Sequence, residues 1–241
     1  MLNIVTALKI EAEPIIKHFK LKSRDGIYQN ETINLIITGQ GKIKSAINTA
    51  LLLSKHIYPT LNIGIAGSSD YDVNEGFFIH KITDSDTGYN YYPDIINSQT
   101  EEIHTVSKIG KYYKLTDMEA SGFFEAAYKF LNVNEIILYK IVSDTPSHKA
   151  NKNEIPKLIK SHLNTIENLI MQTAEKNDFF NEINNALTEA KTKMQLTKTQ
   201  ENQLKQLLTL YKIKNIPFPA FKEIKKKEEV KEFLKSLSKS Y

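Results

Sequence analysis

Three acidic residues stand at positions where α/β proteins commonly bind ligands. Glu11 comes shortly after the apolar run that opens the sequence, Asp144 directly follows a strongly apolar run, and Glu119 lies in the first turn of a predicted helix. Ligands of α/β sheets bind at the carboxyl ends of strands, where carboxyl groups can act as general acids or bases. Glycine turns at 39–41 and at Gly67 end two further apolar runs. Together these segments indicate one ligand site.

Each of these residues also has a purely structural interpretation. Glu11 can favour a helix N-terminus through its charge, and Asp117 can cap a helix in which Glu119 is a solvated first-turn residue. Asp144 can accept hydrogen bonds from the backbone of a turn, and residues 39–41 can form an ordinary turn, since they lack the dinucleotide-binding pattern. Taken singly, these interpretations are preferred. The presence of the whole set in one chain favours a functional site.

Strands alternate with helices over residues 1–175. Apolar runs predict strands at 3–7, 33–38, 61–66, 77–83, 102–107 and 135–142, and helical spacing predicts helices at 11–20, 42–56, 118–130 and 155–174. This alternation predicts an α/β fold with a largely parallel sheet under helices.

The character of the sequence changes near residue 175. Segments 178–191, 199–210 and 228–237 carry Leu and Phe on one helical face, and the proline-containing segment 216–219 separates the last two. We therefore expect an α/β domain over 1–175 and a Lys-rich helical appendage over 176–241. The charged run 222–227 is expected to be solvated.

The composition is that of a globular protein. Of the 241 residues, 41% are hydrophobic and 25% are charged, which excludes a chain that is disordered throughout. No apolar run approaches the roughly 18 residues of a membrane helix, and Met1–Val5 lacks the basic leader of a signal peptide. Cysteine is absent, which excludes disulfides and thiol catalysis. We expect a soluble, cytoplasmic protein without a membrane partner.

The basic residues are almost all lysine. Arg24 is the only arginine among 32 basic residues, and the net charge is +4. Arginine is the usual bidentate ligand of phosphate, so a phosphate clamp is not expected. No aromatic residues interleave with the basic run 222–227, so nucleic-acid binding is not expected either. The scattered histidines lack metal-ligand spacing and no phosphate-binding loop occurs, so neither a metal nor a cofactor is expected.

Five motifs occur in a characteristic order along the chain. They are ALKIE at 7–11, TGQGK at 38–42, NIGIAG at 62–67, DMEAS at 117–121 and VSD at 142–144. This ordered set resembles the nucleoside phosphorylase/nucleosidase superfamily and is most similar to its methylthioadenosine/S-adenosylhomocysteine nucleosidases. The resemblance covers about residues 1–175. It implies a three-layer α/β/α sandwich around a mixed, partly barrel-like sheet.

The resemblance also implies cleavage of the N-glycosidic bond of a purine nucleoside. Asp144 would be the general acid that protonates the purine at N7, and Glu11 would hold the attacking water with Thr38 nearby. Glu119 would bind the ribose hydroxyls, and Lys140 stands where the nucleosidases have an arginine. A protonated acid and a second, ionised carboxylate suit an oxocarbenium-like transition state. Lys140 is expected to help keep Glu11 ionised.

The remaining expected binding residues are neighbours of these within the motifs: Met118, Gly39, Ser143, Ala66 and Gly67. The expected substrate is a 5′-modified adenosine such as methylthioadenosine, S-adenosylhomocysteine or 5′-deoxyadenosine. Because the 5′ pocket of this family is apolar and often completed by a second subunit, the resemblance implies a homodimer.

Two alternatives to a hydrolase stay open from the sequence. A phosphorylase would use phosphate in place of water, although Arg24 lies outside the matching motifs and Glu11 would repel the anion. A catalytically degenerate nucleoside-binding protein or adaptor would fit the short segment 109–115. That segment contains Tyr112 and Tyr113 where the family has a longer loop that recognises the purine.

Overall fold

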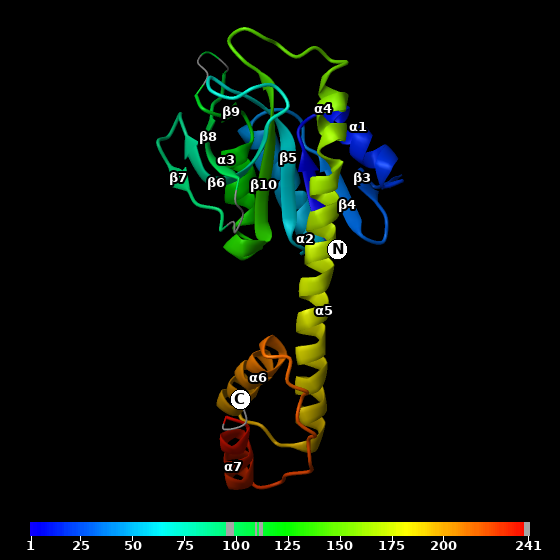
Figure 1. The fold of residues 1–241 in the computed structure, drawn as a ribbon, viewed down its shortest axis with the longest axis vertical. Helices are drawn as coiled ribbons and strands as arrows, with labels where there is room; N and C mark the ends of the chain where they lie inside the picture. The colour runs from blue at the N-terminus through cyan, green and yellow to red at the C-terminus, as the bar shows by residue number, and fades with distance from the viewer. Residues whose placement is uncertain (95–98, 109, 111–112, 239–241) are drawn as a thin grey trace. The chain divides into compact units, whose positions relative to one another are not determined.

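The protein consists of two compact units, which comprise Met1–Thr173 and Ala174–Tyr241. A computed structural model describes residues 1–94, 99–108, 110 and 113–238 (Figure 1). The strands of the first unit are β1 (Leu2–Thr6), β2 (Lys22–Arg24), β3 (Ile27–Gln29), β4 (Ile33–Ile37), β5 (Thr60–Gly67), β6 (Gly76–Asp84), β7 (Asn90–Tyr91), β8 (Thr100–Thr105), β9 (Thr116–Asp117) and β10 (Ile136–Asp144). Its helices are α1 (Lys9–His18), α2 (Lys42–Lys55), α3 (Ala120–Ala127), the short η1 (Val133–Glu135), α4 (Ile155–Ser161) and the first part of α5 (Leu163–Lys193).

Part of the sheet closes into a five-stranded ring. Strand β10 pairs with both β5 and β6, and the path from β6 returns to β5 through β8 and β9. Strands β1, β4, β3 and β2 extend the sheet outward from β5. The pairs β1–β4, β1–β5 and β5–β10 are parallel, whereas β6–β10, β3–β4 and β2–β3 are antiparallel. The mixed, partly barrel-like sheet is therefore confirmed. Its longest pairings, β5–β10, β6–β8 and β1–β4, are parallel, which agrees with the expectation of a largely parallel sheet.

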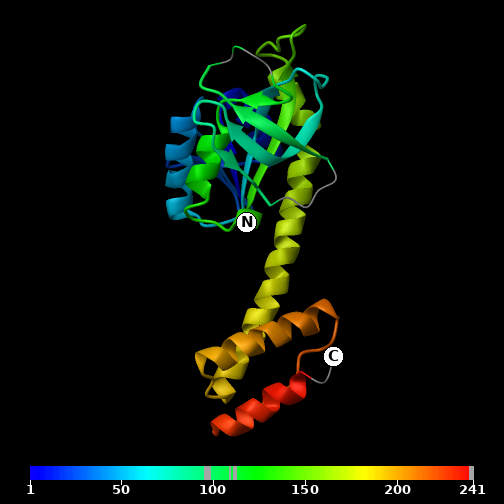
Figure 2. The same ribbon diagram turned by 90° about the vertical axis from the view of Figure 1, so that its left-hand side faces the viewer.

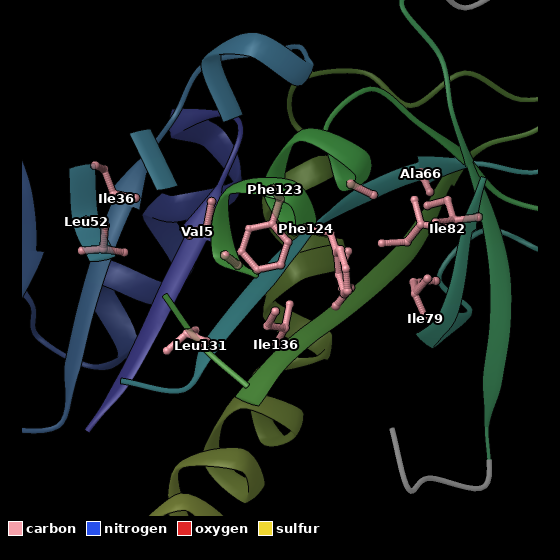
Figure 3. Close-up of a cluster of buried hydrophobic side chains, with 14 of the residues drawn as sticks. Val5, Ile36, Leu52, Ala66, Ile79, Ile82, Phe123, Phe124, Leu131 and Ile136 are labelled. Carbon is pink, nitrogen blue, oxygen red and sulfur yellow. The ribbon is translucent and has the colours of Figure 1, made fainter. Parts of the chain in front are cut away.

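Helices cover both faces of this sheet, as Figures 1 and 2 show. On one face, Leu52 of α2 and Phe123 of α3 pack against Val5 and Ile36 of the sheet. Figure 3 shows the rings of Phe123 and Phe124 within this cluster. On the other face, side chains of α1, α4 and the start of α5 form a second cluster, to which Ile15 and Ile159 belong. The result is the expected three-layer sandwich.

The helix predicted over 155–174 is broken, and this is a correction. Helix α4 ends at Ser161 and α5 begins at Leu163. The side chain of His162, between them, is committed to the sheet unit: Nδ1 lies 2.8 Å from Tyr139 Oη and Nε2 lies 3.0 Å from the Asn74 carbonyl oxygen. These long-range contacts hold His162 out of helical geometry. The following helix then runs past residue 175, so the helix predicted at 178–191 is part of α5.

The second unit has a hydrophobic core of its own. It contains the rest of α5 together with α6 (Lys198–Ile213) and α7 (Lys227–Leu237). Ile183, Leu204, Leu208 and Leu234 are among its buried side chains. The lysines of the run 222–227 are exposed, as predicted. Among the helices that the structure describes, none is both long and apolar enough to cross a membrane.

Candidate active site

Glu11 lies in the first turn of α1 with its carboxylate against β5. Oε2 accepts a hydrogen bond from the Leu8 N–H at 2.7 Å, and Oε1 accepts one from the Ile65 N–H at 3.0 Å. A side chain at Gly64 would come within 2.9 Å of Glu11 Oε1, so glycine at this position is what allows the close approach. Burial raises the pKa of Glu11, and the two N–H donors and the charge of Lys140 only partly oppose that effect.

Glu119 precedes α3 and faces the start of α2. Its Oε1 accepts a hydrogen bond from the Gly41 N–H at 2.8 Å. Burial, followed by the charge of Asp117, raises the pKa of Glu119 to about 7, although Lys140 and the Gly41 N–H act in the opposite direction. Only 7% of the residue is exposed. The interpretation of Glu119 as a solvated first-turn residue is therefore wrong.

Asp117 binds the start of α3, but it is not the N-cap of that helix, which is Glu119. Its Oδ2 accepts a hydrogen bond from the Ala120 N–H at 2.8 Å, and Oδ1 accepts one from Thr105 Oγ1 at 2.9 Å. The same carboxylate forms an ion pair with Lys140, whose Nζ lies 2.9 Å from Oδ2. Lys140 was expected to help keep Glu11 ionised. Its ammonium does lower the pKa of Glu11, but its direct partner is Asp117.

Asp144 ends β10, at a point where the pairing with β5 shifts register opposite Gly67. Its Oδ1 accepts a hydrogen bond from the Ala150 N–H at 3.1 Å, and Oδ2 accepts one from the Ser143 hydroxyl. The proposed interpretation of Asp144 as a turn residue that binds a backbone amide therefore describes part of its environment. Unlike Glu11, the residue is half-buried and keeps access to solvent.

A single cavity of about 80 Å³ brings Glu11, Glu119 and Asp144 together. Its described lining residues are Ala7, Leu8, Glu11, Gln40, Ile65, Ala66, Gly67, Thr116, Asp117, Met118, Glu119, Ser143 and Asp144. These include seven of the ten residues predicted from the sequence. Five of the six additional ones lie within the five motifs, and the sixth, Thr116, directly precedes DMEAS.

Among the residues that the structure describes, three predicted site residues do not line this cavity: Thr38, Gly39 and Lys140. The Thr38 hydroxyl instead donates to the Gly39 carbonyl oxygen at 2.9 Å. Gly39 has a φ of 82° and shapes the turn that leads to Gly41. Lys140 is 1% exposed and acts on the site through Asp117 and through its charge.

Sequence reasoning missed Gln40 and underrated Asp117. Gln40 Nε2 lies 3.0 Å from the sulfur of Met118. This contact joins the motif TGQGK at 38–42 to the motif DMEAS at 117–121. Both residues lie inside motifs that were recognised, but only the fold shows that the segments touch.

The segment in which the family has its purine-recognition loop is only partly described. Residues 109, 111 and 112, including Tyr112, lie outside the described residues. The ring of Tyr113 stacks on His104 with a centroid distance of 3.9 Å, and its carbonyl oxygen accepts a hydrogen bond from the Ser69 N–H at 2.9 Å. Tyr113 thus anchors the end of this segment to the loop after β5.

The electrostatic character of the cavity is acidic. Glu11, Asp117, Glu119 and Asp144 supply carboxyl groups, while Lys140 is the cation buried beside them. Arg24 is exposed on β2 and is not among the lining residues. Such a site favours developing positive charge in a bound molecule and disfavours an anion.

Solved structures with the same architecture are numerous. An Arabidopsis thaliana 5′-methylthioadenosine nucleosidase in apo form matches with a TM-score of 0.59 and 14% identity, over 70% of this chain and 95% of that chain. A Campylobacter jejuni 5′-methylthioadenosine/S-adenosyl homocysteine nucleosidase matches with a TM-score of 0.58 and 15% identity, over 73% and 98%. The chain has the methylthioadenosine nucleosidase fold. The resemblance inferred from the motifs is thereby confirmed at the level of the fold.

The nucleosidase fold also occurs in a futalosine hydrolase mutant of Helicobacter pylori, which matches with a TM-score of 0.58 and 13% identity, over 71% of this chain and 98% of that chain. No protein-family model and no curated protein matches the sequence. The chain therefore shares the nucleosidase fold with proteins to which its sequence is only 13–15% identical.

Proposed function

We propose that the protein hydrolyses the N-glycosidic bond of a purine nucleoside, with a 5′-modified adenosine as its substrate and free adenine as a product. The observation that carries the proposal is the convergence of Glu11, Glu119 and Asp144 on one cavity. These carboxylates come from three separate segments of the nucleosidase fold. Glycosidic cleavage needs an acid for the leaving group and a carboxylate that activates water.

The environments of the three carboxylates suit different roles. Asp144, half-buried at a strand end, would donate a proton to N7 of the purine. Glu11 is the general base for water, since a carboxylate whose pKa is raised by burial accepts a proton more readily at neutral pH. Glu119, when ionised, accepts hydrogen bonds from the ribose hydroxyls and places negative charge beside the sugar cation.

Water is favoured over phosphate as the nucleophile. The four carboxyl groups around the cavity support this choice, and Arg24 is exposed and is not among the described lining residues. A phosphate dianion would have to enter a site whose buried ammonium is already paired with Asp117. The protein is therefore proposed to be a hydrolase and not a phosphorylase.

Substrate entry requires the cavity to widen. Its volume of about 80 Å³ is smaller than the roughly 300–1,000 Å³ typical of ligand pockets. The contact between Gln40 and Met118 joins two of the lining segments. We propose that a bound nucleoside takes the place of this contact.

We also propose that two copies of the chain associate through the exposed face of α2. Ile43 and Ile47 are 76% and 61% exposed. Together with Leu51 they are spaced four residues apart, so they lie on the same face of α2. A groove of about 820 Å³ beside them is lined by Tyr91, Tyr128 and other residues of β7 and α3. A second copy would cover these side chains. Sedimentation of the wild type and of Ile47→Lys tests this, since only the wild type is expected to be a dimer.

The activity is proposed to reside in residues 1–175, with 176–241 as an appendage, and the location is proposed to be cytoplasmic.

The functional test is incubation with methylthioadenosine, S-adenosylhomocysteine, 5′-deoxyadenosine, futalosine, adenosine and inosine. Release of adenine from a 5′-modified adenosine supports the proposal. Asp144→Asn should reduce that release roughly 10²–10⁴-fold through loss of the general acid. Binding of a nucleoside without release of base would instead favour the degenerate, nucleoside-binding alternative.

A further inference from the structure

A second charged cluster lies next to the cavity, and no role has been assigned to it above. The Lys42 ammonium, at the first residue of α2, lies 3.0 Å from both carboxylate oxygens of Asp84 and also contacts Asp86. Asp84 ends β6 and is 4% exposed. Burial alone would raise the pKa of Asp84. Hydrogen bonds from Ser121, from Lys42 and from the Thr87 N–H outweigh burial and lower this pKa to about 2.

This cluster ties the starts of two helices together. The Ser121 hydroxyl, in the first turn of α3, donates to Asp84 Oδ2 at 2.7 Å, so that Lys42 and Ser121 hold the same carboxylate. At Gly122 a side chain would collide with the Lys42 carbonyl oxygen. The first turns of α2 and α3 therefore pack backbone against backbone, and the ion pair of Lys42 and Asp84 lies beside this contact, with 19% of the Lys42 side chain exposed.

One residue that flanks this junction, Glu119, belongs to the proposed active site, and another, Gly41, binds it. Gly41 directly precedes Lys42, has a φ of 104° and donates its N–H to Glu119 Oε1 at 2.8 Å. Glu119 stands two residues before Ser121. The separation of the two helix starts thus sets the Gly41–Glu119 contact, on which the orientation of the Glu119 carboxylate depends.

We propose that Lys42 is a positioning residue: through Asp84 and Ser121 it holds the first turns of α2 and α3 together, so that the Gly41 N–H orients the Glu119 carboxylate toward the cavity. The consequence for catalysis rests on the proposed function. The positioning itself is a property of the folded chain and can be measured without substrate.

The test is hydrogen exchange of the Gly41 amide, followed by NMR on the full-length protein without ligand. Lys42→Met removes the cation, and Ser121→Ala cuts the link to α3 without changing any charge. Both should lower the protection of the Gly41 amide about tenfold, while Lys42→Arg should retain it. Lys55→Met, at the other end of α2, and Ser54→Ala, at an exposed position of the same helix, are the matched controls and should behave as the wild type.

A second readout is the titration of the Glu119 carboxyl group, assigned with Glu119→Gln. Because the Gly41 N–H stabilises the ionised form, its loss in Ser121→Ala should move the titration midpoint upward. Where the protein cleaves a nucleoside, KM should rise about five- to tenfold in Ser121→Ala, with a smaller change in kcat.

Wild-type protection of Gly41 together with an unchanged Glu119 titration in folded Ser121→Ala would overturn the inference. If Lys42→Met does not fold, the comparison of Ser121→Ala with Lys42→Arg decides whether the cluster positions the Gly41 N–H. Loss of Gly41 protection in a protein that cleaves no nucleoside would support the positioning and refute only the proposed function.

Discussion

Lys140 Nζ lies 2.9 Å from Asp117 Oδ2, and both side chains are buried beneath the candidate active site. The pair connects the middle of β10 to the segment that precedes α3, and Glu119 lies between the two residues in the sequence. Burial, followed by the charge of Asp117, raises the pKa of Glu119 to about 7, and the charge of Lys140 opposes them only in part. The pair is therefore expected to control both the stability of the fold and the charge of the site.

Lys140→Met should be strongly destabilising, by roughly 3–5 kcal/mol, because it leaves the Asp117 carboxylate buried without a partner. The double variant Lys140→Met with Asp117→Asn removes both charges and should recover most of that loss. Urea denaturation of the wild type, both single variants and the double variant measures this. Equal stabilities of Lys140→Met and the double variant would show that the pair does not account for the loss.

The stability of the protein should depend on Glu119 between about pH 4.5 and 7. Its pKa in the folded protein is about 7, above the ordinary value of 4.5, so in this range the folded state holds a proton that the unfolded state has released. The contribution of Glu119 is therefore fully present below pH 4.5 and is lost as the pH rises toward 7. Glu119→Gln should be more stable than the wild type at pH 8, by roughly 1–3 kcal/mol. The two proteins should converge at pH 4, and a difference that is the same at both pH values would contradict the assignment.

Gly64→Ala should reduce turnover without unfolding the protein. A side chain at this position would come within 2.9 Å of Glu11 Oε1, and it would displace the carboxylate from the Ile65 N–H. We expect kcat to fall at least tenfold, since misplacement of a catalytic group by about 1 Å is already costly. Full activity of Gly64→Ala would show that the position of Glu11 is not critical.

A chain that ends at residue 173 should fold and keep the activity. Ile166 and Leu169 of α5 belong to the core of the first unit, whereas Ile183 and later residues of the same helix belong to the core of the second. A cut after Thr173 therefore divides the helix between two separate cores. Circular dichroism and adenine release from the truncated chain measure this. Loss of folding would show that the two parts are stabilised as one.

The sequence predicted those features that depend on local pattern. The long strands and the helices α2 and α7 were found from periodicity within one or two residues of their observed ends, and α6 extends three residues beyond its predicted end. The strands β2, β3, β7 and β9 were not found, because two or three residues carry no periodic signal. The helix break at His162 was also missed, since it depends on contacts with Tyr139 and Asn74 that are distant in sequence.

The site was predictable as a set of residue types and less so as a set of contacts. Glu11, Glu119 and Asp144 were found because they stand at the ends of predicted elements inside recognisable motifs. The choice of Asp117 as the partner of Lys140 could not be predicted, because two carboxylates of DMEAS compete for the same ammonium and only packing decides between them. The contact between Gln40 and Met118 joins segments that are far apart in the chain.

The most direct test of the account is product analysis with and without phosphate. The protein is incubated with methylthioadenosine and with 5′-deoxyadenosine, and both adenine and the sugar product are quantified. We expect equal rates of adenine release in both buffers, with a free sugar as the second product, because Glu11 is proposed to activate water in a cavity rich in carboxylates. Adenine release that requires phosphate and yields a sugar 1-phosphate would contradict it.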